Sequence, residues 1–133
     1  MVPEIDWNLL RDKASSMIDR AYAPYSGFPV GASGLTLDGR LVLGCNVENV
    51  SYGLGICAEI ALCAHLFATG GGRLIAVSVC DSRGGILMPC GRCRQVLLEH
   101  GGPGLEVDHP RGSTTLGHLL PDAFGPDDLA AGR

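Results

Sequence analysis

Lysine is almost absent from this chain, with Lys13 as its only example. Arginine does not compensate, because 10 basic side chains stand against 14 acidic ones and leave a formal net charge of -4. A chain with this balance offers no basic surface to a phosphate backbone. We therefore expect no nucleic-acid partner.

Long apolar runs are also missing. No run reaches the roughly 18 residues that span a bilayer, and residues 1–6 are acidic where a secretory signal would be basic and then hydrophobic. The sequence therefore predicts a cytoplasmic protein with no membrane partner. In that compartment the six cysteines are expected to be reduced thiols or metal ligands rather than disulfides.

Aromatic residues are few, at 5% of the chain, while apolar residues make up 46%. The core is therefore expected to consist of aliphatic side chains. No repeat of fixed period and no low-complexity tract divides the sequence. A chain of 133 residues has the usual size of one domain. We expect a single domain over residues 1–133 with a flexible tail at residues 130–133.

The first half of the chain predicts a helix and a hairpin. Apolar residues recur at steps of three and four over residues 6–21, which is typical of an amphipathic helix. Residues 30–37 and 41–50 are rich in strand-forming residues and flank Asp38-Gly39, a dipeptide preferred in type I′ turns. These two segments are predicted to pair as antiparallel strands.

The second half alternates helices and strands. Residues 57–69 are apolar nearly all round, which suits a helix buried against a sheet, and residues 74–80 predict a fully buried strand. A helix at residues 90–100, a short strand at 105–107 and a short helix at 116–120 follow. This order predicts an α/β fold with three layers, α/β/α, around a mixed central sheet.

Three cysteines have a spacing suited to a metal. Cys90 and Cys93 lie in the sequence Pro-Cys-Gly-Arg-Cys, so on the first turn of a helix their thiols project to the same side. Cys57, at the start of another helix, can complete a set of three thiolates. Helix N-termini lower thiol pKa values and so favour the thiolate that a metal requires. Ligands of this softness indicate zinc.

A set of three protein ligands is typical of catalytic zinc, because the fourth position of the ion is left to water. Glu59 lies two residues after Cys57 and is expected to reach that water without being a ligand. The alternative is a structural site with Cys45, Cys63 or Cys80 as fourth ligand. Cys63 is expected on the opposite side of its helix, and the other two sit inside predicted strands as small buried hydrophobes.

The order of these motifs resembles that of the zinc-dependent deaminases, in which Cys-x-Glu or His-x-Glu precedes Pro-Cys-x-x-Cys. Because Gly-Cys-Asn-Val-Glu-Asn-Val-Ser-Tyr-Gly stands ahead at residues 44–53, the chain more closely resembles the small homotetrameric cytidine deaminases. The likeness extends from residues 22–26 to residues 119–124, nearly the whole chain. It implies a cytidine deaminase-like fold with one zinc ion per subunit on the three thiolates.

The resemblance also implies a sugar-binding pair. In that family an Asn-x-Glu pair ahead of the zinc helix binds the ribose, and Asn46 and Glu48 match it. Residues two apart on a strand face the same side, and an amide with a carboxylate can hold a hydroxyl that both donates and accepts. The alternative is a pair of polar residues on a solvated strand face.

Aromatic residues of the family's pocket are matched as well. Phe28 corresponds to the ring that stacks on the base, and Ala58 lies among the substrate-binding positions; a core role is the alternative for Phe28. Tyr52 and Phe124 match aromatic residues that the family contributes to a neighbouring subunit's pocket. For these two the alternative is packing within the subunit. The resemblance thus implies a homotetramer with shared active sites.

One position departs from the family pattern. Many members carry arginine directly after the catalytic glutamate, where it hydrogen-bonds the zinc thiolates, whereas this chain has Ile60. Three thiolates leave the zinc unit with a net negative charge, so another donor is expected to offset it. The candidates are Arg92, Arg94 and the backbone N–H groups at the two helix starts.

The implied activity is that of a hydrolase acting on a cyclic amidine: deamination of cytidine and deoxycytidine to uridine and deoxyuridine in pyrimidine salvage. In this mechanism zinc-bound hydroxide attacks C4, and Glu59 is the catalytic residue that passes protons to N3 and to the leaving amine. Two alternatives remain: a deaminase of another small aminated nucleoside or base, and a non-catalytic zinc-binding module.

Overall fold

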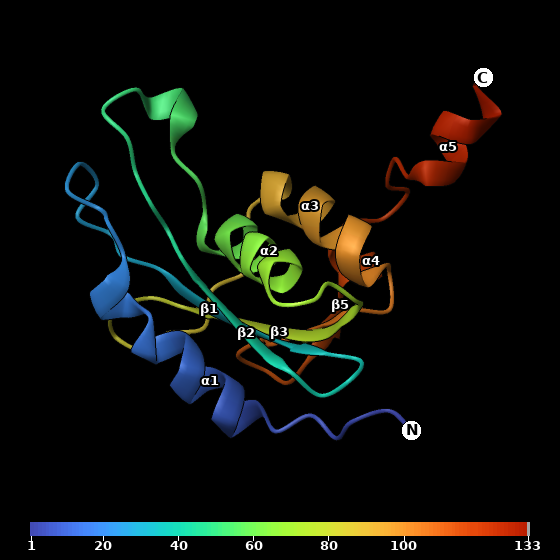
Figure 1. Ribbon diagram of the computed structural model, residues 1–133, viewed down its shortest axis with the longest axis horizontal. Coiled ribbons are helices and arrows are strands. Elements are labelled where there is room, and N and C mark those ends of the chain that lie inside the picture. Colours follow the sequence, from blue (N-terminus) through green and yellow to red (C-terminus); the bar gives the residue numbers. More distant parts are fainter. Residues whose placement is uncertain (133) are drawn as a thin grey trace.

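A computed structural model describes residues 1–132 and contains one five-stranded sheet flanked by helices (Figure 1). Two single-turn 3-10 helices accompany the regular elements, η1 (Ile18–Arg20) and η2 (Tyr52–Leu54). In chain order the helices and strands are α1 (Trp7–Ser16), β1 (Gly31–Thr36), β2 (Leu41–Cys45), α2 (Ala58–Ala68), β3 (Leu74–Cys80), α3 (Gly91–Gly101), β4 (Glu106–Val107), β5 (Thr114–Thr115), α4 (Leu116–Leu119) and α5 (Pro126–Ala131).

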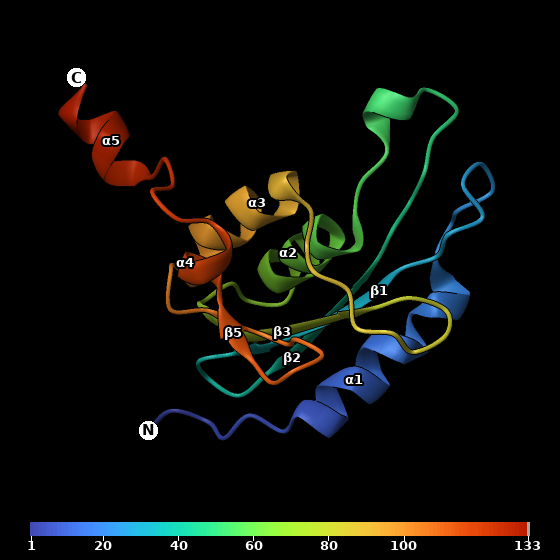
Figure 2. The same cartoon turned by 180° about the vertical axis from the view of Figure 1, so that it is seen from behind.

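The sheet has the strand order β2-β1-β3-β4-β5 and is mixed. β1 pairs antiparallel with both β2 and β3, β3 pairs parallel with β4, and β4 pairs antiparallel with β5. Figures 1 and 2 show α1 on one face of the sheet and α2 with α3 on the other. The predicted α/β/α architecture is confirmed.

Two glycines let helices approach the sheet closely, one on each face. A Cβ atom on Gly31 would lie 2.0 Å from the carbonyl oxygen of Ala14 in α1. A Cβ atom on Gly44 would lie 2.2 Å from the carbonyl oxygen of Ala58 and 2.5 Å from the backbone nitrogen of Leu62, both in α2. These are backbone atoms, which cannot rotate away. The two glycines therefore fix the depth at which α1 and α2 sit.

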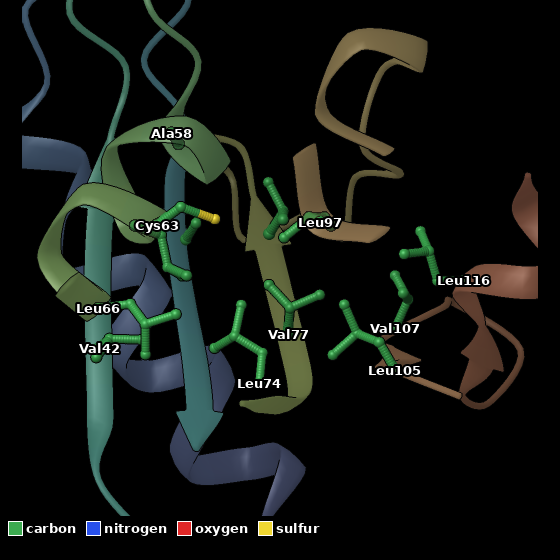
Figure 3. Packing of buried hydrophobic residues seen from close by; sticks show 13 residues of the cluster. Val42, Ala58, Cys63, Leu66, Leu74, Val77, Leu97, Leu105, Val107 and Leu116 are labelled. Atoms are coloured by element: carbon green, nitrogen blue, oxygen red, sulfur yellow. The ribbon is translucent and has the colours of Figure 1, made fainter. Parts of the chain in front are cut away.

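The main core lies between the sheet and α2 and α3. Figure 3 shows Cys63 and Leu66 from α2 and Leu97 from α3 directed toward Val77 and its neighbours on the strands. A smaller cluster of Leu10, Leu35 and Ala76 lies under α1. Among residues 1–132 no buried core residue is aromatic, so the expected aliphatic core is confirmed.

The predicted hairpin forms, but its turn is not of type I′. That type needs positive φ at both central residues, and Asp122 is the only non-glycine residue with positive φ in the part of the chain described. Instead Gly39 alone has positive φ, 89°, and its N–H donates to the carbonyl of Thr36 at 3.0 Å. A type I turn followed by a left-handed glycine makes a three-residue loop.

Several element ends differ from the sequence prediction. The strand expected at residues 41–50 ends at Cys45, and Val47 makes only isolated bridges to Tyr22 and Ile56. The first helix ends at Ser16 and continues only as the short η1. β5 and α5 were not predicted.

The C-terminal residues extend from the body as α5, visible at the red end of the chain in Figures 1 and 2. The predicted flexible tail overlaps its last turn, where Ala131 is exposed. Arg133, the end of that predicted tail, lies outside the described residues. None of the helices in residues 1–132 has the length and apolar character required to cross a membrane.

Candidate active site

Three thiols meet where two helices begin. Cys57 is the N-cap of α2, Cys90 is the N-cap of α3, and Cys93 lies in the first turn of α3. Their sulfur atoms all lie within 4.8 Å of one another. The predicted set of three thiols is confirmed as a group able to hold a metal ion, and soft sulfur ligands of this number fit zinc.

The alternative of a four-cysteine site receives no support. The group of ligand atoms contains no thiol other than the three at the helix starts. Cys63 and Cys80 are buried elsewhere, and burial raises the pKa of the Cys63 thiol to about 11. Such a thiol behaves as a small hydrophobe.

Local backbone geometry explains how the thiols come together. Cys57 and Cys90 both have extended backbone conformations, with φ and ψ of -76° and 160° and of -66° and 169°. Each carbonyl then accepts the first bond of its helix, from Ala61 at 3.1 Å and from Arg94 at 2.9 Å. Because α2 and α3 lie side by side on the same face of the sheet, the two helix starts face one place (Figure 1).

The three thiols differ in how readily they ionise. Backbone N–H groups of Cys93 and Arg92 lower the pKa of Cys90, whereas burial raises the pKa of Cys57 and of Cys93. The expectation that the helix starts lower the thiol pKa values is confirmed for Cys90 and is wrong for the other two. A buried thiolate loses its hydration, and at Cys57 and Cys93 this loss raises the pKa by more than the N–H groups of the helix starts lower it.

Glu59 lies beside the thiols in the first turn of α2. It is 4% exposed, and this burial raises the pKa of its carboxyl group. A carboxyl group shifted in this direction holds a proton at higher pH than an exposed one does. Its surroundings therefore suit a group that both accepts and donates protons.

A cleft of about 180 Å³ opens at this place. Five of the predicted site residues line it: Asn46, Cys57, Ala58, Glu59 and Cys90. The sequence did not predict the apolar walls, which come from Val30, Val79, Leu87 and Met88. Leu87 and Met88 stand directly before the Pro-Cys motif, and this position is the one signal that could have indicated them.

Glu48 lines a different pocket, of about 350 Å³, together with Ser26 and Tyr52. Its Oε1 accepts hydrogen bonds from the backbone N–H groups of Tyr25 at 3.0 Å and Ser26 at 3.1 Å, and its Oε2 accepts from the Ser26 hydroxyl. These bonds hold the pKa of Glu48 below its usual range, and the bond from the Ser26 hydroxyl has the largest effect. The carboxylate therefore stays ionised and fixed in place.

Asn46 also binds the preceding loop. Its side-chain oxygen accepts from the N–H of Val30 at 2.9 Å and its amide nitrogen donates to the carbonyl of Phe28 at 3.0 Å. Asn46 and Glu48 both follow the end of β2, so the expectation that they lie within that strand is wrong, but both side chains bind the same loop, residues 25–30. The Asn46 side chain thereby ties the loop at residues 28–30 to the end of β2.

The three aromatic candidates are exposed to different degrees. Phe28 is 51% exposed, Tyr52 82% and Phe124 62%. Tyr52 lines the larger pocket and its ring lies 6.2 Å from that of Tyr25, whereas neither phenylalanine lines either pocket. The structure therefore does not bring these three rings to the metal cleft.

The donors proposed to offset the thiolate charge differ in their contacts. The Arg94 side chain donates to the carbonyls of Pro89 and Leu119 rather than to a thiol. The Arg92 side chain is exposed and makes no hydrogen bond to the described part of the chain. Backbone N–H groups supply the donors at Cys90.

Three clustered thiols, a buried carboxylate and a small cleft on an α/β/α scaffold together define a metal-dependent enzyme. Residues 6–105 match the family described as the cytidine and deoxycytidylate deaminase zinc-binding region. A cytidine deaminase from Mycobacterium tuberculosis is 60% identical over 132 residues, which cover 99% of each chain. This chain therefore belongs to the cytidine and deoxycytidylate deaminase family.

Solved structures agree with this assignment. The crystal structure of a mutant cytidine deaminase from Mycobacterium tuberculosis matches with a TM-score of 0.93 and 60% identity, covering 95% of this chain and 100% of that one. The cytidine deaminase from Mycobacterium leprae matches with a TM-score of 0.88 and 53% identity, covering 90% and 100%.

Proposed function

We propose that this chain acts as a single domain that deaminates cytidine and deoxycytidine by hydrolysis, in pyrimidine salvage in the cytoplasm. The observation that carries the proposal is that Glu59 lines the same cleft as Cys57 and Cys90, with Cys93 completing the thiol group. The relatives named as cytidine deaminases support the choice of substrate. Six free cysteines are consistent with a reducing compartment.

Cys57, Cys90 and Cys93 would hold the zinc ion. When bound, zinc supplies an activated water, because three protein ligands leave the fourth position of the ion to solvent. Glu59 takes a proton from the attacking water and delivers it to N3 of the base. It then assists protonation of the amine that leaves C4 as ammonia. Its burial keeps these protons between the carboxylate and the substrate.

Asn46 and Glu48 would hold the sugar hydroxyls. Both side chains already bind the loop at residues 25–30. In the complex each side chain would therefore bind the loop and a sugar hydroxyl at the same time. Phe28 on that loop would stack on the base, and its half-exposed ring supports this role over a core role. Ala58, which lines the cleft with Glu59, would contact the base.

Neighbouring subunits would complete the site in a homotetramer. Tyr52 and Phe124 are both mostly exposed, which supports a role in a neighbouring subunit's pocket over packing within their own subunit. An acidic chain with a formal charge of -4 favours a small nucleoside over a nucleic acid as substrate and gives no attraction to an anionic membrane surface.

Glu59→Gln tests the proton transfer. The variant is expected to keep zinc and nucleoside binding but to lose activity by about 100-fold or more, because an amide of the same size cannot accept the proton. Ammonia release from cytidine, zinc content and nucleoside affinity are measured on both proteins. Turnover at the parental rate would show that Glu59 does not move the proton.

The same ammonia assay separates the alternatives. A deaminase of another small aminated nucleoside or base would release ammonia from that compound in preference to cytidine. A non-catalytic zinc module would bind zinc and release ammonia from none of the compounds offered. Cytidine turnover that disappears when zinc is removed and returns when it is restored supports the proposed activity.

A further inference from the structure

Arg94 makes two hydrogen bonds that the proposed chemistry does not use. Its Nε donates to the carbonyl of Pro89 at 2.6 Å, and its NH1 donates to the carbonyl of Leu119 at 2.8 Å. The side chain is partly buried. A guanidinium carries its donors in a fixed planar fork, so it can hold two acceptors at a set separation.

The first of these bonds holds the peptide next to a metal-binding thiol. The carbonyl of Pro89 belongs to the peptide group that leads into Cys90, the N-cap of α3, and Cys90 has no side-chain capping bond. The backbone N–H of Arg94 donates to the carbonyl of Cys90 at 2.9 Å. One residue therefore holds the backbone on both sides of the Cys90 thiol.

The second bond ties this turn to the C-terminal part of the chain. Leu119 is the last residue of α4, and the neighbouring Gln95 donates from Nε2 to the carbonyl of Phe124 at 2.8 Å. Consecutive residues of α3 thus hold two points of the segment at residues 119–124. The turn at Pro89 is therefore held against the end of α4 through Arg94.

The position of Arg94 in its helix supports a specific role. A cation in the first turn of a helix lies at the positive end of the helix dipole, which is unfavourable. Two carbonyl oxygens offset this at Arg94. Arg92 lies in the same turn with the same charge, but its side chain is exposed and makes no hydrogen bond to residues 1–132.

We propose that Arg94 is a positioning residue for the metal site: it clamps the Pro89–Cys90 peptide to the end of α4 and thereby aims the Cys90 thiol at the other two. The proposal rests on the zinc ligands assigned in the proposed function. Its test measures the release of zinc, which does not depend on catalytic activity.

Arg94→Gln and Arg92→Gln form a matched pair, because each removes one positive charge from the same helix turn. Zinc release into excess chelator is followed by the absorbance of a coloured chelator, using the zinc-loaded full chain. We expect Arg94→Gln to release zinc about 10- to 100-fold faster than the parent and Arg92→Gln to stay within about twofold of it. Equal release rates for the two variants would overturn the proposal.

Arg94→Lys separates geometry from charge and serves if Arg94→Gln does not fold. A lysine keeps the charge, but its single ammonium group cannot reproduce the planar fork. We therefore expect fast zinc release from Arg94→Lys as well. Zinc release at the parental rate would show that the positive charge, and not the planar fork, holds the metal site, and it would contradict the proposal. If the parent binds zinc but releases no ammonia from cytidine, the proposed activity fails while the zinc comparison still decides the role of Arg94.

Discussion

The hydroxyl of Ser26 joins two of the residues proposed to bind nucleoside. It donates to Oε2 of Glu48 and accepts from the backbone N–H of Phe28 at 3.0 Å. The same hydroxyl is the largest cause of the low pKa of Glu48. One side chain therefore fixes the Glu48 carboxylate and the backbone of Phe28 relative to each other.

Ser26→Ala is expected to raise KM for cytidine by roughly three- to tenfold with little change in kcat, because it removes one hydrogen bond from a binding residue and none from Glu59. Ser26→Thr keeps the hydroxyl and is expected to behave like the parent. Steady-state kinetics on the three proteins give both constants. A fall in kcat at unchanged KM in Ser26→Ala would contradict this role.

The pH dependence of binding provides an independent test of Ser26. Glu48 holds the loop as a carboxylate, so with its lowered pKa the bonds are fully present above the ordinary carboxyl range and are lost as pH falls through the lower value. Without the Ser26 hydroxyl that pKa rises toward its usual range. In Ser26→Ala the acid-side increase in KM should therefore begin at higher pH than in the parent and in Ser26→Thr.

The chemistry of the metal site could be predicted at the residue scale because its ligands belong to two local motifs. The spacing of Cys90 and Cys93 and the order Cys57-Ala58-Glu59 need no knowledge of distant contacts. Burial depends on tertiary packing, however, and local sequence does not give it. For this reason the raised pKa values of Cys57 and Cys93 were not predicted.

Among the elements, α2 depends most closely on one sheet position. Gly44 in β2 faces backbone atoms of α2, and α2 has Cys57 as its N-cap and carries Glu59. Gly31 in β1 faces α1 in the same way, but α1 carries no residue of the proposed site. The two glycines therefore provide matched positions with different expected consequences.

Gly44→Ala and Gly31→Ala are each expected to lower the free energy of unfolding by about 1–3 kcal/mol, because the added methyl group meets backbone that cannot rotate away. In Gly44→Ala the shift of α2 should also speed zinc release and lower kcat, whereas Gly31→Ala should leave zinc release unchanged. Denaturant unfolding, the chelator assay and steady-state kinetics measure the three effects.

Gly104→Ala is the control for these substitutions, because a Cβ atom there would have no heavy atom within 4 Å, and Gly104 has no left-handed φ. It is expected to match the parent in stability and zinc release. Identical zinc release from Gly44→Ala and Gly31→Ala would show that the depth of α2 does not control the site.

Periodicity predicted the elements that pack on the core and missed those that depend on distant partners. The buried helix expected at residues 57–69 appears as Ala58–Ala68, and the strand at residues 74–80 appears with the predicted bounds. β5 is two residues long and exists through its pairing with β4. A segment of that length leaves no periodic pattern, and strand order cannot be derived from local sequence.

At the scale of the whole molecule, the segment with η2 and the C-terminal α5 both extend from the body (Figures 1 and 2). Figures 1 and 2 show the segment with η2 on one side and α5 on another. The first carries Tyr52 and Leu54, which are exposed, and exposed Phe124 lies just ahead of the second. Exposed apolar groups gathered on extended segments are typical of surfaces that meet another chain.

Dilution is expected to dissociate a tetramer and to reduce activity in parallel, because each site would lose residues from its neighbours. Phe124→Ala is expected to bind nucleoside less tightly while retaining zinc, and Leu37→Ala, at the exposed β1–β2 turn, serves as control. Analytical ultracentrifugation and activity assays over one dilution series test this. A fully active monomer would exclude shared sites, and Tyr52 and Phe124 would then have no role in a neighbour's pocket.

The three-thiol group also affects the thermodynamics of the unfolded chain. An ion that joins Cys57 to Cys90 closes the loop between residues 57 and 90, and in an unfolded chain that closure would cost about 4 kcal/mol of chain entropy. The folded sheet has already brought the two sulfur atoms together, so it binds a bridging ion roughly a thousandfold more tightly than the open chain would. By the same linkage the ion stabilises the sheet, and its removal favours unfolding.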